Sequence, residues 1–119
     1  ETLIAIMPMG FCYPGRYERG GDLPPRTECA PTWHNRILKS LPNIQTTLYV
    51  GAYAQKHYLP SQANLSLTQR VADWRSHAPE SWVLPHPSWR NTAWIKRNLW
   101  FSDELLPALR KSVQASLTA

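Results

Sequence analysis

The amino-acid sequence predicts an α/β fold with a parallel sheet that helices cover on both faces. Short apolar segments typical of strands alternate with segments whose apolar residues recur every three or four positions, as in helices. At residues 46–58 a strand, a glycine turn and a helix follow one another, which is half of a parallel α/β unit. A chain of 119 residues that is 43% hydrophobic can form one modest core, so we expect residues 1–119 to be a single domain.

Three strands are expected because three short apolar runs are bounded by turn residues, at residues 3–9, 46–50 and 82–84. Residues 10–25 form a Gly- and Pro-rich loop that is longer than a simple connection requires. Three strands are few for this fold class, and the chain begins at Glu1 without a methionine. We therefore expect a further strand in an N-terminal part that this sequence does not include.

Five helices are expected, at residues 26–41, 52–58, 66–76, 91–100 and 103–117. Their boundaries follow from local signals: Pro42 ends the first helix, Ser66 and Gln69 fit a capping box, and Asn91 is a preferred N-cap residue. The first and last helices carry apolar residues at four-residue intervals, namely Cys29, Trp33, Ile37 and Leu41, then Leu105, Leu109, Val113 and Leu117. Three tryptophans fall on apolar faces and are expected in the core: Trp33, Trp74 and Trp82.

The net charge of the chain indicates which kinds of partner it could bind. Thirteen Lys and Arg against eight Asp and Glu give a net charge of +5, which fits either a polyanion partner or a solvated basic surface. No apolar run approaches the roughly 20 residues of a membrane span, so we expect no membrane partner. No basic residue precedes the first apolar run, as it would in a secretory leader, so we expect a cytoplasmic protein.

The segment at residues 84–91 is the strongest candidate for a site. His86 follows an expected strand, and ligands of open α/β sheets bind at the carboxyl ends of strands. Pro85 and Pro87 fix two φ angles beside it and so restrict the histidine backbone. The segment is therefore either a rigid catalytic loop or an ordinary proline-rich turn that contains a histidine.

Cys12 and Cys29 are 17 positions apart and are separated by the long loop. Three interpretations remain open: two unrelated buried thiols, a disulfide that closes the loop, or half of a four-cysteine metal or iron–sulfur site. The expected reducing compartment disfavours the disulfide.

Four segments together resemble the uracil-DNA glycosylase superfamily, most closely its bacterial iron–sulfur branch (families 4 and 5). They are residues 7–15 (MPMGFCYPG), 21–31 (GDLPPRTECAP), 50–54 (VGAYA) and 86–91 (HPSWRN). The resemblance covers nearly the whole chain and implies a three-layer α/β/α sandwich around a mostly parallel, four-stranded sheet. It also implies that this chain is roughly the C-terminal three-quarters of the domain, because the family's first motif, a Gly-x-x-Pro-Gly loop that supplies the water-activating residue, is absent.

The resemblance implies a function and a set of site residues. The protein would be a monomeric hydrolase of DNA repair that excises uracil or another deaminated base from DNA, with His86 as its catalytic residue. The implied DNA-binding residues are Ser88, Trp89, Arg90 and Asn91, with Trp89 as a wedge, and the implied base pocket is Gly10, Phe11 and Tyr13. Cys12 and Cys29 would be two of the four ligands of a [4Fe–4S] cluster, the others coming from a family Cys-x-x-Cys pair absent here.

Two positions depart from the family pattern. Pro8 stands where iron–sulfur members carry an asparagine that recognises uracil, and Trp89 replaces a common proline. With Pro8 there, either another residue recognises the base or the preferred base is not uracil, and a nucleic-acid-binding relative without catalysis stays open. An α/β domain with unrelated hydrolase chemistry is a third hypothesis.

Overall fold

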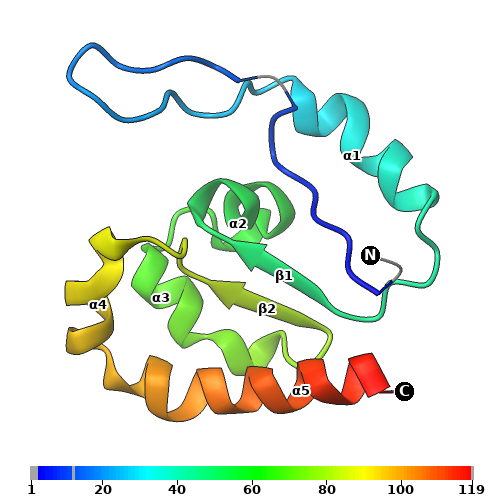
Figure 1. Ribbon diagram of the computed structural model, residues 1–119, viewed down its shortest axis with the longest axis vertical. Coiled ribbons are helices and arrows are strands. Elements are labelled where there is room, and N and C mark those ends of the chain that lie inside the picture. Colours follow the sequence, from blue (N-terminus) through cyan, green and yellow to red (C-terminus); the bar gives the residue numbers. More distant parts are fainter. Residues whose placement is uncertain (1–2, 12, 119) are drawn as a thin grey trace. The chain divides into compact units, whose positions relative to one another are not determined.

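The computed structural model of the protein describes residues 3–11 and 13–118. The chain divides into two compact units, Glu1–Ile44 and Gln45–Ala119. Figure 1 shows the course of the chain through both units. Among the described residues, none of the helices combines the length and the apolar character that crossing a bilayer requires.

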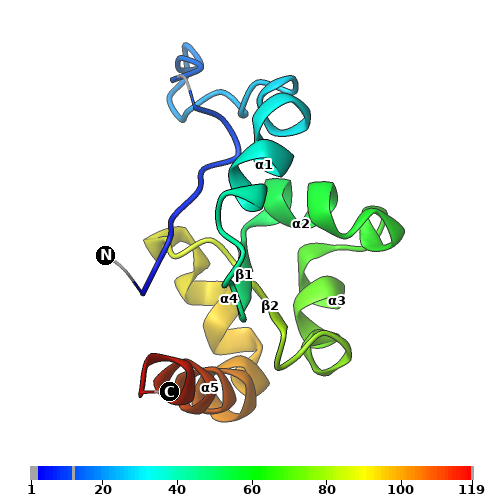
Figure 2. The same ribbon diagram turned by 90° about the vertical axis from the view of Figure 1, so that its right-hand side faces the viewer.

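The second unit is built on two parallel strands. Strand β1 (Thr47–Val50) pairs with β2 (Ser81–Leu84), with Thr47 opposite Ser81 and Val50 opposite Leu84. The connection between the strands contains α2 (Ala52–Tyr58) and α3 (Leu67–Ala72) with two 3₁₀ turns, and β2 is followed by a 3₁₀ turn, α4 (Thr92–Arg97), a π-helical turn and α5 (Leu106–Thr118). Figure 2 shows α3 and α5 on opposite sides of the two strands. The unit is thus a mixed α/β structure with a parallel sheet, as the sequence predicts.

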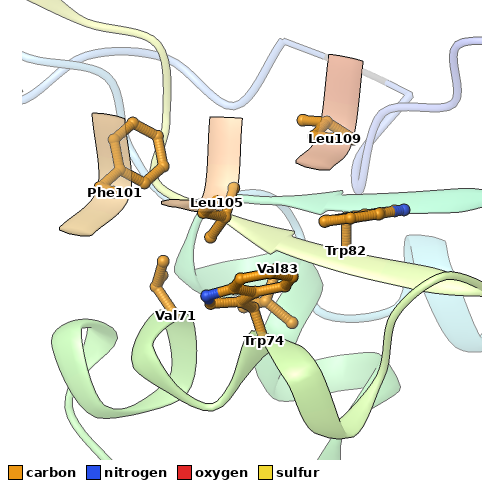
Figure 3. Close-up of a cluster of buried hydrophobic side chains, with 7 residues drawn as sticks. All are labelled: Val71, Trp74, Trp82, Val83, Phe101, Leu105 and Leu109. Atoms are coloured by element: carbon orange, nitrogen blue, oxygen red, sulfur yellow. The ribbon is translucent and has the colours of Figure 1, made fainter. Parts of the chain in front are cut away.

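The core of this unit consists of seven buried side chains, which Figure 3 shows. They are Val71, Trp74, Trp82, Val83, Phe101, Leu105 and Leu109. Two of them come from β2 and the others from the helical segments that pack against it. The rings of Trp74 and Trp82 stack with their centres 5.5 Å apart. The prediction that these two tryptophans belong to the core is therefore confirmed.

Several element boundaries follow from local chemistry. Ser66 accepts a hydrogen bond from the Gln69 N–H while the Gln69 side chain accepts one from the Ser66 N–H, so the predicted capping box is confirmed. Helix α2 has the predicted bounds. The last helical segment starts earlier than predicted, because the π-helical turn Phe101–Leu105 precedes α5.

The first unit contains α1 (Cys29–Lys39), which ends before Pro42 as predicted, and a long loop at residues 13–25. The prediction of a buried strand at residues 3–9 is wrong: this segment is irregular, and Ile6 is 92% exposed. A strand needs a hydrogen-bonded neighbour. Among the described residues of this unit, the single bridge between Arg16 and Asp22 is the only β-type pairing, and it lies in the loop.

The buried face of α1 also differs from the prediction. Trp33 is 46% exposed, whereas Cys29, Ala30 and His34 are buried. The imidazole Nε2 of His34 donates a hydrogen bond to the Pro8 carbonyl over 2.9 Å, which allows this polar ring to be buried. Trp33 precedes the buried His34 by one position and therefore points about 100° away from it around the helix axis. The centre of the Trp33 ring lies 5.1 Å from the Arg36 guanidinium carbon.

Candidate functional site

His86 lies two residues beyond the end of β2, and its side chain is exposed. The Gly51 N–H, just past the end of β1, donates a hydrogen bond to the Leu84 carbonyl over 2.9 Å, so the carboxyl ends of both strands meet here. A Cβ atom on Gly51 would lie 3.7 Å from His86 Cβ and 3.8 Å from its Cδ2, and Gly51 has a φ of +88°. The positive φ therefore favours glycine at this position, whereas a Cβ at these distances would make only ordinary van der Waals contact with His86. The imidazole is at the edge of the sheet where α/β folds bind ligands.

The loop that carries His86 is held from within. The Asn91 side chain donates a hydrogen bond to the His86 carbonyl over 2.5 Å, and the Ser88 hydroxyl accepts one from the Arg90 N–H over 3.2 Å. The prediction that Asn91 caps a helix to residue 100 needs correction: Asn91 precedes α4, but its side chain bonds His86 instead, and α4 ends at Arg97. Ser88 caps the 3₁₀ turn Trp89–Asn91 in its place.

The tip of this loop presents an aromatic ring and a cation. The Trp89 side chain is 81% exposed, and the Arg90 guanidinium carbon lies 5.7 Å from the centre of its ring. The Ser88 hydroxyl uses an acceptor lone pair for the cap, so its O–H can still donate to an anion. The tip therefore offers groups that can stack on a base and bind phosphate.

Sequence reasoning missed a buried polar pair behind this site. Gln55 on α2 and Arg70 on α3 are 0% and 2% exposed, and they are hydrogen-bonded to each other. A signal for Arg70 was present, because residues 67, 70, 71 and 74 follow the spacing of one helix face and the other three are apolar. A charged residue in an apolar stripe predicts a specific buried partner.

The predicted base-pocket residues belong to the first unit, whereas His86 belongs to the second. In the first unit Gly10 packs against Pro25: a Cβ on Gly10 would lie 3.2 Å from the proline Cβ. Phe11 meets the His34 ring edge-on, with 5.7 Å between ring centres, and the Tyr13 hydroxyl donates to Asp22 over 3.1 Å. His34 is a third buried polar residue, after Gln55 and Arg70, that the sequence did not predict. The role of these residues in a base pocket stays a prediction.

Cys29 is buried at the start of α1 with a free thiol, and Cys12 lies outside the described residues. Over residues 3–11 and 13–118, no three His, Cys, Asp or Glu side chains are gathered closely enough to hold a metal ion. A four-iron cluster requires four ligands, and the chain contains two cysteines. The residues of this chain therefore do not form a complete cluster site.

One protein-family model matches residues from both units. The model of the uracil DNA glycosylase superfamily matches residues 3–110. The match includes the long N-terminal loop, both strands and the His86 loop, and it ends within α5. Because it covers most of the sequence, the chain belongs to the uracil DNA glycosylase superfamily.

Proposed function

We propose that the protein, in its natural full length, is a DNA glycosylase that hydrolyses the N-glycosidic bond of a flipped uracil or another deaminated base. The observation that carries the proposal is the placement of His86: exposed, at the carboxyl ends of two parallel strands, on a loop closed by the hydrogen bond from Asn91. Membership of the superfamily supports glycosylase chemistry and DNA as the partner.

His86 would act on the leaving base. As the glycosidic bond breaks, its electron pair moves onto the base, negative charge develops on uracil O2, and the sugar becomes oxocarbenium-like. An N–H of the imidazole donates a hydrogen bond to O2 and stabilises this charge, as an oxyanion hole does. Water then adds to the sugar carbon and loses a proton, and the base leaves as its neutral form after taking up a proton. A neutral imidazole is sufficient for this role.

The loop tip would hold the DNA. Arg90 and Ser88 would contact phosphates beside the extruded nucleotide, and Trp89 would occupy the space that the base vacates. The exposure of Trp89 and the free donor of Ser88 support these roles. Asn91 is the exception, because its amide is already bonded to His86. We therefore assign Asn91 to bracing of the loop, with DNA contact through its remaining polar atoms.

We propose that the protein is a monomeric, cytoplasmic, bacterial enzyme of the iron–sulfur branch, with a three-layer α/β/α domain. Cys12 and Cys29 would supply two thiolate ligands of a [4Fe–4S] cluster, and the other two ligands would come from residues outside this sequence. The reaction above uses no step at such a cluster.

The test is an excision assay of the natural full-length protein on single- and double-stranded oligonucleotides that contain uracil, hypoxanthine or xanthine. We expect an abasic product for at least one of the three bases, and its loss in His86→Ala. An absence of abasic product for all three bases would rule out the proposed activity.

A second candidate function is nucleic-acid binding without catalysis, and Pro8 favours it. Proline has no side-chain hydrogen-bonding group with which to recognise a base, and its carbonyl is already bonded to His34. Tight, salt-sensitive DNA binding that is undiminished in His86→Ala, together with no turnover, would support this candidate.

A further inference from the structure

Gln55 and Arg70 form a continuous hydrogen-bonded chain from α3 to the carboxyl ends of both strands. The Gln55 Nε2 donates to the Leu84 carbonyl over 2.7 Å and to the Tyr49 carbonyl over 3.2 Å. The Arg70 Nε donates to the Gln55 Oε1 over 2.8 Å. A second guanidinium nitrogen of Arg70, Nη1, donates to the Leu65 carbonyl. One buried amide thus connects the end of β1, the end of β2 and α3.

Arg70 determines which way the Gln55 amide points. A guanidinium group only donates hydrogen bonds, so it must face the amide oxygen. The amide NH₂ then necessarily faces the two strand-end carbonyls. A charged donor on the amide oxygen also polarises the amide and strengthens the bonds that its NH₂ donates.

Stability alone gives little reason for this arrangement. A buried guanidinium is costly to desolvate, and the ion pairs among the described residues are Arg26–Glu28 and Arg75–Glu104, so Arg70 is compensated by neutral oxygens. Even buried ion pairs can often be replaced by apolar side chains of similar volume without loss of stability. We therefore expect a functional role of Gln55 and Arg70 beyond the packing of the core.

We propose that Gln55 and Arg70 are positioning residues that set the orientation of His86 for base excision. The inference rests on the proposed function. Leu84, which receives the Gln55 hydrogen bond, is joined to His86 through the buried Pro85, whose ring fixes φ. A shift of the Leu84 backbone would therefore move the His86 imidazole by a similar distance. Errors of about 1 Å in a catalytic group cost on the order of 100-fold in rate.

The test compares Arg70→Met with a matched control in the full-length protein. Arg70→Met keeps Gln55 but removes the donor that orients it. Gln62→Met is the control, because the Gln62 amide also makes two side-chain hydrogen bonds in this unit, to Asp73 and His77, and neither involves a strand end. Single-turnover excision rate, DNA affinity and unfolding temperature are measured for each, at a temperature where each variant is folded.

We expect Arg70→Met to lower the single-turnover rate by roughly 10- to 100-fold with unchanged DNA affinity. Gln62→Met should lower the unfolding temperature and leave the rate at the wild-type value. Arg70→Lys, which retains a donor for Gln55, should recover part of the rate. If Arg70→Met does not fold, the double variant Gln55→Met with Arg70→Met removes both polar partners and takes its place. An equal rate loss in Gln62→Met would overturn the proposal.

A second measurement does not depend on turnover. In the NMR spectrum of the full-length protein, the His86 ring should give one sharp set of signals, which broadens or splits in Arg70→Met and not in Gln62→Met. If no base is excised by the wild type, the proposed function fails, and these signals still decide whether the pair positions His86. Unchanged His86 signals in a folded Arg70→Met protein would overturn the inference.

Discussion

The side-chain amide of Asn91 donates a hydrogen bond to the backbone carbonyl of His86, with 2.5 Å between Nδ2 and the oxygen. This bond closes residues 86–91 into a loop whose tip carries the exposed Trp89. On the other side of the histidine, the Leu84 carbonyl is held by Gly51 and Gln55. The histidine is thus fixed from both directions along the chain by hydrogen bonds that leave its ring free.

We predict that Asn91→Ala loosens the loop and lowers the excision rate. Loss of one such hydrogen bond costs about 1 kcal/mol of stability, whereas a misplaced imidazole lowers the rate by roughly tenfold or more. Asn98→Ala is a matched control, because the Asn98 amide donates to the Trp94 carbonyl over 2.8 Å at the far end of α4. Single-turnover rates and thermal unfolding of both variants test the prediction, which fails if the two variants lose the same rate.

Local patterns in the sequence predict much of the second unit. The strand at residues 46–50, the following helix and the capping box of Ser66 depend on residues within a few positions of one another, and all three are confirmed. The position of His86 after a strand follows from the same local patterns.

Features that depend on distant partners were not predictable in this way. The apolar run at residues 3–9 has the composition of a strand, but composition does not supply a neighbouring strand. The sequence predicts that the Asn91 side-chain oxygen accepts a hydrogen bond from an N–H of the following helix, but in the structure the Asn91 amide instead donates to the His86 carbonyl. Gln55 contacts a residue 29 positions away, which no periodicity indicates.

His86→Ala tests the catalytic role directly. If the imidazole stabilises only the developing charge on the base, we expect the single-turnover rate to fall by roughly 10²- to 10³-fold, the range for one oxyanion-type donor. DNA affinity should be nearly unchanged. If the variant instead unfolds the second unit while its folded fraction keeps the rate, His86 is a structural residue of the loop.

Arg90→Ala should produce the complementary effect. Arg90 is exposed at the loop tip, where it can reach a phosphate. We expect DNA binding to weaken across all sequences, and the slope of log affinity against log salt to decrease by about one unit. Fluorescence titrations at several salt concentrations measure this slope. An unchanged slope would place Arg90 away from the DNA backbone.

The cysteines give a spectroscopic prediction. If Cys12 and Cys29 ligate a four-iron cluster, the anaerobically purified full-length protein should be brown, with absorbance at roughly 400 nm from iron–thiolate bonds. Cys12→Ser and Cys29→Ser should each reduce this absorbance. A colourless protein with full activity would rule out cluster ligation, and the burial of Cys29 would then be explained by packing alone.

Asp73 should make the second unit sensitive to acid. Hydrogen bonds from the Ser76 hydroxyl and then the Gln62 amide lower the pKa of Asp73, partial burial opposes this, and the charge of His77 adds to the lowering. A carboxylate whose pKa is lower in the folded state stabilises the fold above its unfolded pKa, and this contribution is lost as the pH falls through the folded value.

We therefore expect Asp73→Asn to be less stable than the wild type at neutral pH, and this difference to shrink as the pH falls below about 4, the usual range for an aspartate. Urea unfolding at several pH values measures the difference. Asp103→Asn, at an exposed position of the π-helical turn, is the control and should show no such convergence. A stability difference that is constant with pH would mean that Asp73 acts through hydrogen bonding alone and not through its charge.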